Sequence, residues 1–330
     1  MNAVALTDAE RDALGSSLDR LPSPYVDLEP FLLDVFPLFA ALPRRVLTAI
    51  RAARNDPAVP GALLVENLPV EPDPPATPRS GTALLDRTTF VTEACALGVA
   101  QLLGEPVGYL DERDGAVVQW LFPIASEAHA TSSSSCDIDL ELHTDLNFDS
   151  ANPEAPFTVI NPDFVVLACV RADPDGQATT RYVEARSLCE HLSELQQATL
   201  REPIFEFAAP YTFSGLSGGD RLWSHPSPVL TGPAGSPEMG VDLACGARGC
   251  TPEAQAALDA LREAARRPEI GETVRLRPGH VLVLDNRKGA HGRSAFPARF
   301  DGSDRWVERV YVRRSLWECR RAGQKSYRVV

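Results

Sequence analysis

The stretch Glu141-Leu142-His143-Thr144-Asp145 closes an alternating run that begins at Ile138, and the fold and chemistry of the chain can be read outward from it. His143 and Asp145 lie two residues apart, so on an extended strand both side chains leave the same face. One imidazole and one carboxylate then point at a single position, as in a metal site. The two-residue spacing alone is weak evidence for a metal site, because an edge-strand histidine beside a solvated carboxylate has the same spacing.

A third metal ligand is available late in the chain. His291 lies in the run Gly289-Ala290-His291-Gly292-Arg293, just beyond a strand-like stretch from His280 to Asp285. Two histidines and one carboxylate on one face of a metal ion leave its opposite positions open, which suits non-haem Fe(II) better than structural zinc. We therefore expect His143, Asp145 and His291 to be the protein ligands of an iron ion.

These residues belong to a series of motifs that follow one another along the chain. The segments that carry it are Leu142-His143-Thr144-Asp145, Leu284-Asp285-Asn286 with His291-Gly292-Arg293, and Asp301-Gly302-Ser303-Asp304-Arg305-Trp306. Together they resemble the clavaminate synthase-like branch of the Fe(II)/2-oxoglutarate-dependent oxygenases, a branch that includes arginine, asparagine and lysine hydroxylases. The resemblance runs from about Gly61 to Arg314. Many members have glutamate where Asp145 stands, and either carboxylate can bind iron.

The composition of the chain limits its partners. A chain of 330 residues with 44% hydrophobic content can bury a large core, and we expect one domain, 1–330, with insertions. The net charge of -13 and the absence of a basic run argue against nucleic acid or an anionic membrane as partner. A small polar substrate is more natural, and the resemblance implies an amino acid. We expect a monomer or a homodimer.

The N-terminus and the apolar stretches show no sign of a targeting segment. No apolar stretch approaches transmembrane length, and residues 1–6 lack the basic and apolar regions of a signal peptide. The seven cysteines contain no Cys-x-x-Cys pair and are expected to be reduced thiols. The protein is therefore expected to be cytoplasmic.

Helices are expected mainly at the start of the chain. Residues 1–60 read as a helical scaffold, in which Thr7-Asp8-Ala9-Glu10 is a capping-box pattern that begins a helix. A second helical region from Pro30 to Arg54 should be interrupted at Pro37 and Pro43. Further helices are expected over Ala83–Leu103, Leu188–Leu200 and Thr251–Arg266.

Strands fill most of the remaining chain. They are expected over Ala62–Leu68, Val117–Phe122, Phe164–Arg171, Ile204–Phe213 and most of Glu272–Leu316. Alternating strands bracketed by helices predict an α+β fold with a double-stranded β-helix, or jelly-roll, core flanked by helices, and the resemblance implies the same fold. Residues 214–239 are dense in glycine, serine and proline and should form a lid insertion, with His225 at the surface.

The resemblance also implies a cosubstrate site. 2-Oxoglutarate would chelate the iron and present its distal carboxylate to a buried arginine, whose planar fork grips a carboxylate bidentately. The family places this arginine fourteen residues after the distal histidine, at Arg305. A strand threonine, Thr179 or Thr180, would help to hold the same carboxylate. Arg309 shares the strand face of Arg305 and matches the arginine that grips the α-carboxylate of the substrate.

Other residues match the substrate contacts of relatives. Glu112 and Ser134 would fix the α-amino and α-carboxylate groups, although the serine run 132–135 also reads as a flexible loop. Asp242 occupies the first of two aspartate positions that clamp the guanidinium group in arginine-hydroxylating relatives, and Ala244 replaces the second. One carboxylate suits lysine, ornithine, arginine or a derivative, while the loss of the second weakens the case for arginine.

These expectations define a hydroxylase of secondary metabolism that uses Fe(II), 2-oxoglutarate and O2 to oxidise an unactivated carbon of an L-amino acid. A neutral substrate such as asparagine, a carrier-bound amino acid, and desaturation or ring closure on the same scaffold stay open. Two other classes compete with this interpretation. A zinc hydrolase could use the same three ligands but would not need the 2-oxoglutarate arginine. A metal-containing jelly-roll that only binds a ligand is the other alternative.

Overall fold

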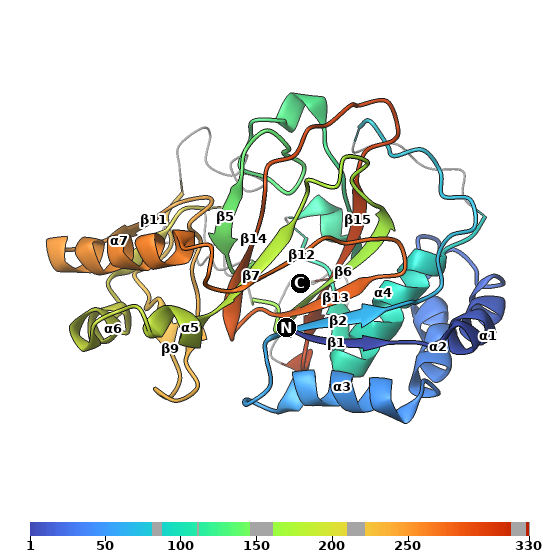
Figure 1. The fold of residues 1–330 in the computed structure, drawn as a ribbon, viewed down its shortest axis with the longest axis horizontal. Coiled ribbons are helices and arrows are strands. Elements are labelled where there is room, and N and C mark those ends of the chain that lie inside the picture. The colour runs from blue at the N-terminus through green and yellow to red at the C-terminus, as the bar shows by residue number, and fades with distance from the viewer. Residues whose placement is uncertain (81–87, 111, 146–160, 210–221, 318–327, 330) are drawn as a thin grey trace.

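The computed structural model describes residues 1–80, 88–110, 112–145, 161–209, 222–317 and 328–329. These residues form a mixed α+β fold with two main β-sheets and helices on the outside of each (Figure 1). The larger sheet has seven strands, in the order β1 (Asn2–Ala5), β2 (Ala62–Glu66), β13 (Val281–Asp285), β6 (Phe164–Arg171), β15 (Trp306–Arg313) and β3 (Glu105–Val107), with β4 (Val118–Leu121) also pairing with β15.

The centre of this sheet is the strand β6, which pairs antiparallel with β13 on one side and β15 on the other. All its residues except Arg171 are buried, and its sequence is a continuous apolar run. Such a run, without polar alternation, is typical of a strand covered on both faces. The strand predicted over Phe164–Arg171 is therefore confirmed. The parallel pairing of β1 with β2 at the sheet edge was not predicted.

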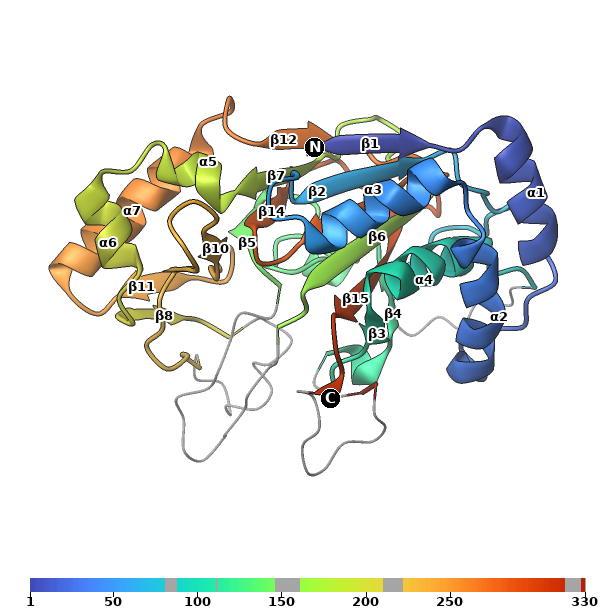
Figure 2. The ribbon, with the colours of Figure 1, turned by 90° about the horizontal axis from the view of Figure 1, so that it is seen from below.

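Four helices cover the outer face of the seven-stranded sheet (Figure 2). They are α1 (Asp8–Leu18), α2 (Leu28–Ala40), α3 (Arg44–Asn55) and α4 (Val91–Leu103). Their apolar residues form one core with alternate residues of the sheet, among them Leu63, Val166 and Val283. The alternation sends the other residues of the same strands into a second core on the inner face.

The helix boundaries follow their capping residues more closely than their prolines. Thr7 caps α1 and makes both hydrogen bonds of the predicted capping box with Glu10. Pro43 separates α2 from α3, but Pro37 lies inside α2, so the predicted interruption there is wrong. Pro37 lacks a backbone N–H group, but it lies in the last turn of the helix, so the loss of this one hydrogen-bond donor affects little of the helix. The helix predicted over Ala83–Leu103 begins only at Val91, and its residues 83–87 lie outside the described residues.

The smaller sheet has four strands, in the order β12 (Glu272–Val274), β7 (Thr180–Glu184), β14 (Gly289–Arg293) and β5 (Leu140–His143). Its outer face packs against α5 (Ala185–Cys189), α6 (Glu194–Leu200) and α7 (Pro252–Arg266), together with a short pair formed by β8 (Phe205–Phe207) and β11 (Ala247–Gly249). The single helix predicted over Leu188–Leu200 is wrong, because Ser193 caps a new helix with its own capping box.

The inner faces of the two sheets pack against each other. Tyr182 of β7 lies in one apolar cluster with Leu64, Leu284 and Val307 of the larger sheet. Its hydroxyl donates a hydrogen bond to the carbonyl oxygen of Asp285 at 2.8 Å, which ties the sheets together. The strands of the described residues do not close into a barrel. The interior between the sheets is where the predicted site residues meet.

The segment predicted as a lid is described from residue 222 onward, while residues 214–221 lie outside the described residues. The described part contains the strands β9 (Leu230–Thr231) and β10 (Glu238–Met239), which pair with each other. Leu230 and Met239 are buried in the core formed with α5, α6 and α7, whereas His225 is exposed. No helix in the described part of the chain is long and apolar enough to cross a membrane.

Candidate metal centre

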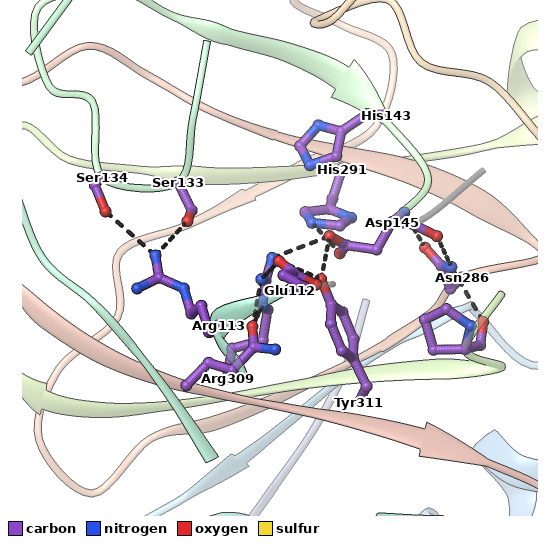
Figure 3. A network of polar contacts seen from close by, with 12 residues as sticks. Glu112, Arg113, Ser133, Ser134, His143, Asp145, Asn286, His291, Arg309 and Tyr311 are labelled. Atoms are coloured by element: carbon purple, nitrogen blue, oxygen red, sulfur yellow. Dashed lines mark hydrogen bonds and ion pairs between the residues drawn. The ribbon is translucent and has the colours of Figure 1, made fainter. Parts of the chain in front are cut away.

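The three predicted metal ligands meet between the two sheets (Figure 3). His143 ends β5 and pairs in register with His291 on β14, and Asp145 follows two residues later. One ligand atom from each residue lies within 4.8 Å of the others. The imidazole rings are 4.5 Å apart between centroids, and Nε2 of His291 lies 3.2 Å from Oδ2 of Asp145. We call His143, Asp145 and His291 the triad.

The free atoms of the triad fit a divalent metal ion. Nδ1 of His143 lies 2.9 Å from the carbonyl oxygen of Glu141, which assigns the proton to Nδ1 and leaves the lone pair of Nε2 available. Oδ1 of Asp145 accepts hydrogen bonds from Nη1 of Arg309 at 3.0 Å and from the hydroxyl of Tyr311 at 2.9 Å. Oδ2 of Asp145 is buried without a hydrogen-bond donor in the described residues. A cation would compensate this buried acceptor.

The electrostatic surroundings keep the triad in the protonation states that metals require. Burial alone would raise the pKa of Asp145, but Arg309, His291 and His143 together outweigh burial and hold the pKa well below its usual range. Burial lowers the pKa of His143, and the neighbouring His291 lowers it further. An ionised carboxylate and a neutral imidazole are the forms that bind a metal ion.

The backbone of the triad is fixed by two neighbouring segments. Asn286, at the end of β13, accepts a hydrogen bond from the amide of Asp145 at 2.8 Å and donates to its carbonyl oxygen at 3.1 Å (Figure 3). On the other side, the Thr144 hydroxyl and the Val241 backbone exchange two hydrogen bonds, both of 3.0 Å. The motif Leu284-Asp285-Asn286 therefore holds the metal strand in place, a role that its sequence did not reveal.

Arg309 lies beside the triad at the centre of a buried polar cluster (Figure 3). Its guanidinium donates to the side chains of Gln119 and Glu112 as well as to Asp145. Burial would lower the pKa of Arg309, but the charges of Glu112 and Asp145 outweigh it and raise the pKa. Sequence reasoning missed Gln119 and Tyr311. The signal for Tyr311 was its position two residues after Arg309, on the same strand face.

Ser134 contacts a different arginine. Its hydroxyl accepts a hydrogen bond from Nη2 of Arg113 at 3.3 Å, and the hydroxyl of Ser133 accepts from the same atom at 3.2 Å. Ser134 and Ser135 are each only 1% exposed, so this half of the serine run is packed into the protein. Hydroxyl groups of the run accept hydrogen bonds from the partly buried Arg113 and the buried Arg293.

Two of the three predicted cosubstrate residues, Arg305 and Thr180, lie in one cavity with the triad histidines. Arg305 is buried and lines a cavity of about 50 Å³ together with both triad histidines, Thr180 and Arg309. Thr179, the alternative to Thr180, points to the opposite face of the sheet and lines a separate cavity there. The alternation of the strand thus separates the two threonines.

Asp242 lies next to the triad but on a separate segment. It forms an isolated antiparallel bridge with His143, and its carboxylate accepts a hydrogen bond from the amide of Cys245 at 2.7 Å. Asp242 is buried, and burial raises the pKa of its carboxyl group against the opposing influence of His143. The structure therefore brings Asp242 to the metal strand.

Comparisons with known proteins agree with this geometry. Residues 81–311 match the family model "Taurine catabolism dioxygenase TauD, TfdA family". The chain is 34% identical to L-asparagine oxygenase of Streptomyces coelicolor over 85% of this chain and 79% of that protein. It is 32% identical to clavaminate synthase 2 of Streptomyces clavuligerus, over 92% and 90%, and 33% identical to L-lysine 3-hydroxylase of Catenulispora acidiphila, over 88% and 78%.

Solved structures give the same result. Asparagine oxygenase in complex with Fe(II), 3-hydroxyasparagine and succinate superposes with a TM-score of 0.85 at 29% identity, covering 100% of this chain and 99% of that one. The oxygenase OrfP in complex with Fe and α-ketoglutaric acid gives 0.79 at 25% identity, covering 99% of each. The chain belongs to the TauD, TfdA family of 2-oxoglutarate-dependent non-haem iron dioxygenases, in its clavaminate synthase-like branch. It is an enzyme of that class, whose cofactors are Fe(II) and 2-oxoglutarate.

Proposed function

We propose that this enzyme hydroxylates a free L-amino acid at an unactivated carbon, with the triad holding Fe(II). The observation that carries the proposal is the buried Arg309, which contacts the triad carboxylate on one side and Glu112 on the other. This arrangement sets a cation and an anion of the protein directly beside the metal centre. A double-stranded β-helix, in which the two facing sheets form the core, is the architecture we propose for the fold.

The cosubstrate end of the site is built around Arg305. This arginine is buried, lines the cavity with the triad histidines, and has no hydrogen-bond acceptor in the described residues. A buried guanidinium without an acceptor favours the binding of a carboxylate, which its planar fork can grip bidentately. We assign the distal carboxylate of 2-oxoglutarate to Arg305, with Thr180 beside it.

The amino-acid end of the site is built around Glu112 and Arg309. Their side chains are only 9% and 7% exposed, and they form an ion pair. Separating a buried pair costs roughly 3–5 kcal/mol when one charge is left uncompensated. A zwitterionic amino acid supplies both missing charges, because its carboxylate can pair with Arg309 and its ammonium with Glu112. Because the amino acid carries no net charge, exchanging one ion pair for two leaves the net charge of the buried site unchanged.

Asp242 is our candidate for the contact with the substrate side chain. An ionised carboxylate there favours a basic amino acid such as lysine, ornithine or arginine, and hydroxylases of these amino acids are among the relatives of this chain. A neutral amide substrate is the second candidate, since a single carboxylate can accept a hydrogen bond from an amide N–H group. The 34% identity to an asparagine oxygenase also supports this second candidate.

The protein contributes mainly position and exclusion of water. When bound, Fe(II) supplies the activation of O2 that couples oxidation of 2-oxoglutarate to succinate and CO2 with oxidation of a substrate C–H bond. In this proposal Arg305 holds 2-oxoglutarate and Arg309 holds the amino acid, each by a carboxylate, in the cavity beside the triad. Apolar residues such as Leu121 and Leu167 line the same cavity and limit the entry of water.

The function can be tested with the metal and cosubstrate before any substrate is known. Anaerobic addition of Fe(II) and 2-oxoglutarate should produce the weak visible absorption band of the chelate. A screen of the twenty amino acids and ornithine for stimulated succinate formation should then identify the substrate. Absence of the band together with activity of a zinc-loaded enzyme would favour the hydrolase alternative. A band without stimulation by any free amino acid would favour a carrier-bound substrate.

A further inference from the structure

A second buried arginine lies beside the proposed cosubstrate site. Arg293 lies on β14 two residues after His291, so both side chains leave the same face of the strand. It is 8% exposed and lines the same cavity as Arg305 and Thr180, and it also borders the cavity on the other face that Thr179 lines. The function proposed above gives this arginine no role.

Neither guanidinium has an acidic partner in the described part of the chain, where no carboxylate oxygen lies within 4.0 Å of Arg293 or Arg305. Arg293 donates one hydrogen bond to Oγ of Ser135 and one to the carbonyl oxygen of Ser294, both of 2.8 Å. Its Nε is buried without a partner among the described residues. The ring of Phe296 flanks both guanidinium groups, with its centroid 5.1 Å from Cζ of Arg293 and 6.0 Å from Cζ of Arg305.

Two neighbouring buried cations that no carboxylate contacts directly are unfavourable, because their charges repel each other. Asp139 near Arg293 and Asp173 near Arg305 act only from beyond 4.0 Å. Burial lowers the pKa of Arg305. A bound anion would remove both penalties at once, because it would pair with two charges that otherwise repel each other.

We propose that Arg293 and Arg305 together bind the distal carboxylate of 2-oxoglutarate, so that this end of the cavity selects a dicarboxylate. The inference rests on the proposed function and adds a second cation to its cosubstrate site. Each Nη atom of Arg293 keeps one N–H group after the bonds to Ser135 and Ser294, and Arg305 keeps all its donors. A 2-oxo acid of the same length without the distal carboxylate would leave both cations unpaired.

A purely structural role for Arg293 is the competing explanation. Its hydrogen bond to Ser135 fastens β14 to the serine run, and this bond could be the reason for the residue. Ser135→Ala removes the acceptor of this bond and leaves the guanidinium in place. The variant is therefore the matched control for Arg293→Gln, which removes the charge.

The experiment is an isothermal titration of the protein loaded with Mn(II), which takes the place of Fe(II) and prevents turnover. The two probes are 2-oxoglutarate and 2-oxopentanoate, which has the same five-carbon chain but lacks the distal carboxylate. Arg293→Gln should raise the Kd of 2-oxoglutarate by about 10- to 100-fold, the loss expected for one charge-assisted hydrogen bond. It should leave the Kd of 2-oxopentanoate and of Mn(II) within about twofold, and Ser135→Ala should leave all three within about twofold.

Three results would overturn the inference. They are an unchanged Kd of 2-oxoglutarate in Arg293→Gln, an equal loss in Ser135→Ala, and an equal weakening of both 2-oxo acids. If Arg293→Gln does not fold, Arg293→Lys keeps the charge and should show a smaller loss of the same selectivity. Failure of the parent protein to bind Mn(II) and 2-oxoglutarate would instead refute the proposed function, and this inference with it.

Discussion

Arg309→Lys should separate binding of the amino acid from binding of the cosubstrate, because Arg309 contacts Glu112 and the triad carboxylate, whereas Arg305 has no carboxylate oxygen within 4.0 Å among the described residues. The Arg309 guanidinium donates to acceptors in three directions, on Gln119, Glu112 and Asp145. A lysine ammonium keeps the charge, but it is a point donor that cannot reach three separate side chains or grip a carboxylate with two parallel bonds.

The size of the effect follows from these contacts. The substrate carboxylate would keep one charged contact and lose the second, which is worth about 1.5–3 kcal/mol for a charge-assisted hydrogen bond. Binding of the amino acid should therefore weaken by roughly 10- to 150-fold. In the free protein a buried acceptor loses its donor, so the variant should also be less stable by about 1–3 kcal/mol.

The assay pairs an anaerobic titration of 2-oxoglutarate with the ratio of hydroxylated product to succinate in turnover. Arg309→Lys should bind 2-oxoglutarate within about twofold of the parent, while the product ratio falls because the substrate is poorly held. Arg305→Lys is the matched control and should show the reverse pattern, with weak 2-oxoglutarate binding. If Arg309→Lys loses 2-oxoglutarate binding and Arg305→Lys keeps it, the assignment of these two arginines is refuted.

Four further outcomes are expected. Alanine at any position of the triad should abolish Fe(II) binding and turnover with little change in circular dichroism, and a variant active in saturating Fe(II) would not have lost a ligand. Tyr311→Phe removes one of two donors to Oδ1 of Asp145, so it should lower Mn(II) affinity several-fold without changing the triad itself, and equal affinity would argue against this role. Asp242→Asn should raise KM for a basic substrate by about 10- to 100-fold, whereas unchanged kinetics would remove this residue from the substrate site. The hydrogen bond from Arg45 lowers the pKa of Glu10 from 4.5 to about 2. The ionised Glu10 therefore stabilises the fold above pH 4.5, and this stabilisation is lost as the pH falls toward 2. In acid unfolding followed by circular dichroism, Glu10→Gln should lose less stability over this pH range than the parent protein.

Much of the candidate site could be predicted because its residues are defined by spacing along single strands. The two-residue spacing of His143 and Asp145 and the strand face shared by Arg305 and Arg309 depend only on the alternation of side chains. The structure accordingly places all four around one centre, with Arg305, Arg309 and His143 lining one cavity. Local capping chemistry was equally readable, as Thr7 shows.

The features that were missed depend on which strands pair and in what register. Gln119 reaches Arg309 only because β4 pairs with β15, with Arg309 opposite Gln119, and no local pattern encodes this contact. The choice between Thr179 and Thr180 likewise required the position of β7 beside β14. The arginine pair Arg293 and Arg305 could not be recognised either, because a sequence shows the charges but not which acids lie within ion-pair distance.

The segment 241–243 has a consequence for attempts to change the substrate of this enzyme. It lies beside the metal strand, where Val241 and Leu243 exchange backbone hydrogen bonds with Thr144 and Leu142. The candidate specificity residue Asp242 is thus the backbone neighbour of the metal ligand His143. Insertions or prolines introduced here to reshape the substrate pocket would move iron and substrate together, whereas side-chain exchanges that preserve the buried Val241 and Leu243 leave the metal strand in register. Directed evolution of a new specificity should therefore proceed by substitution at this segment and not by change of its length.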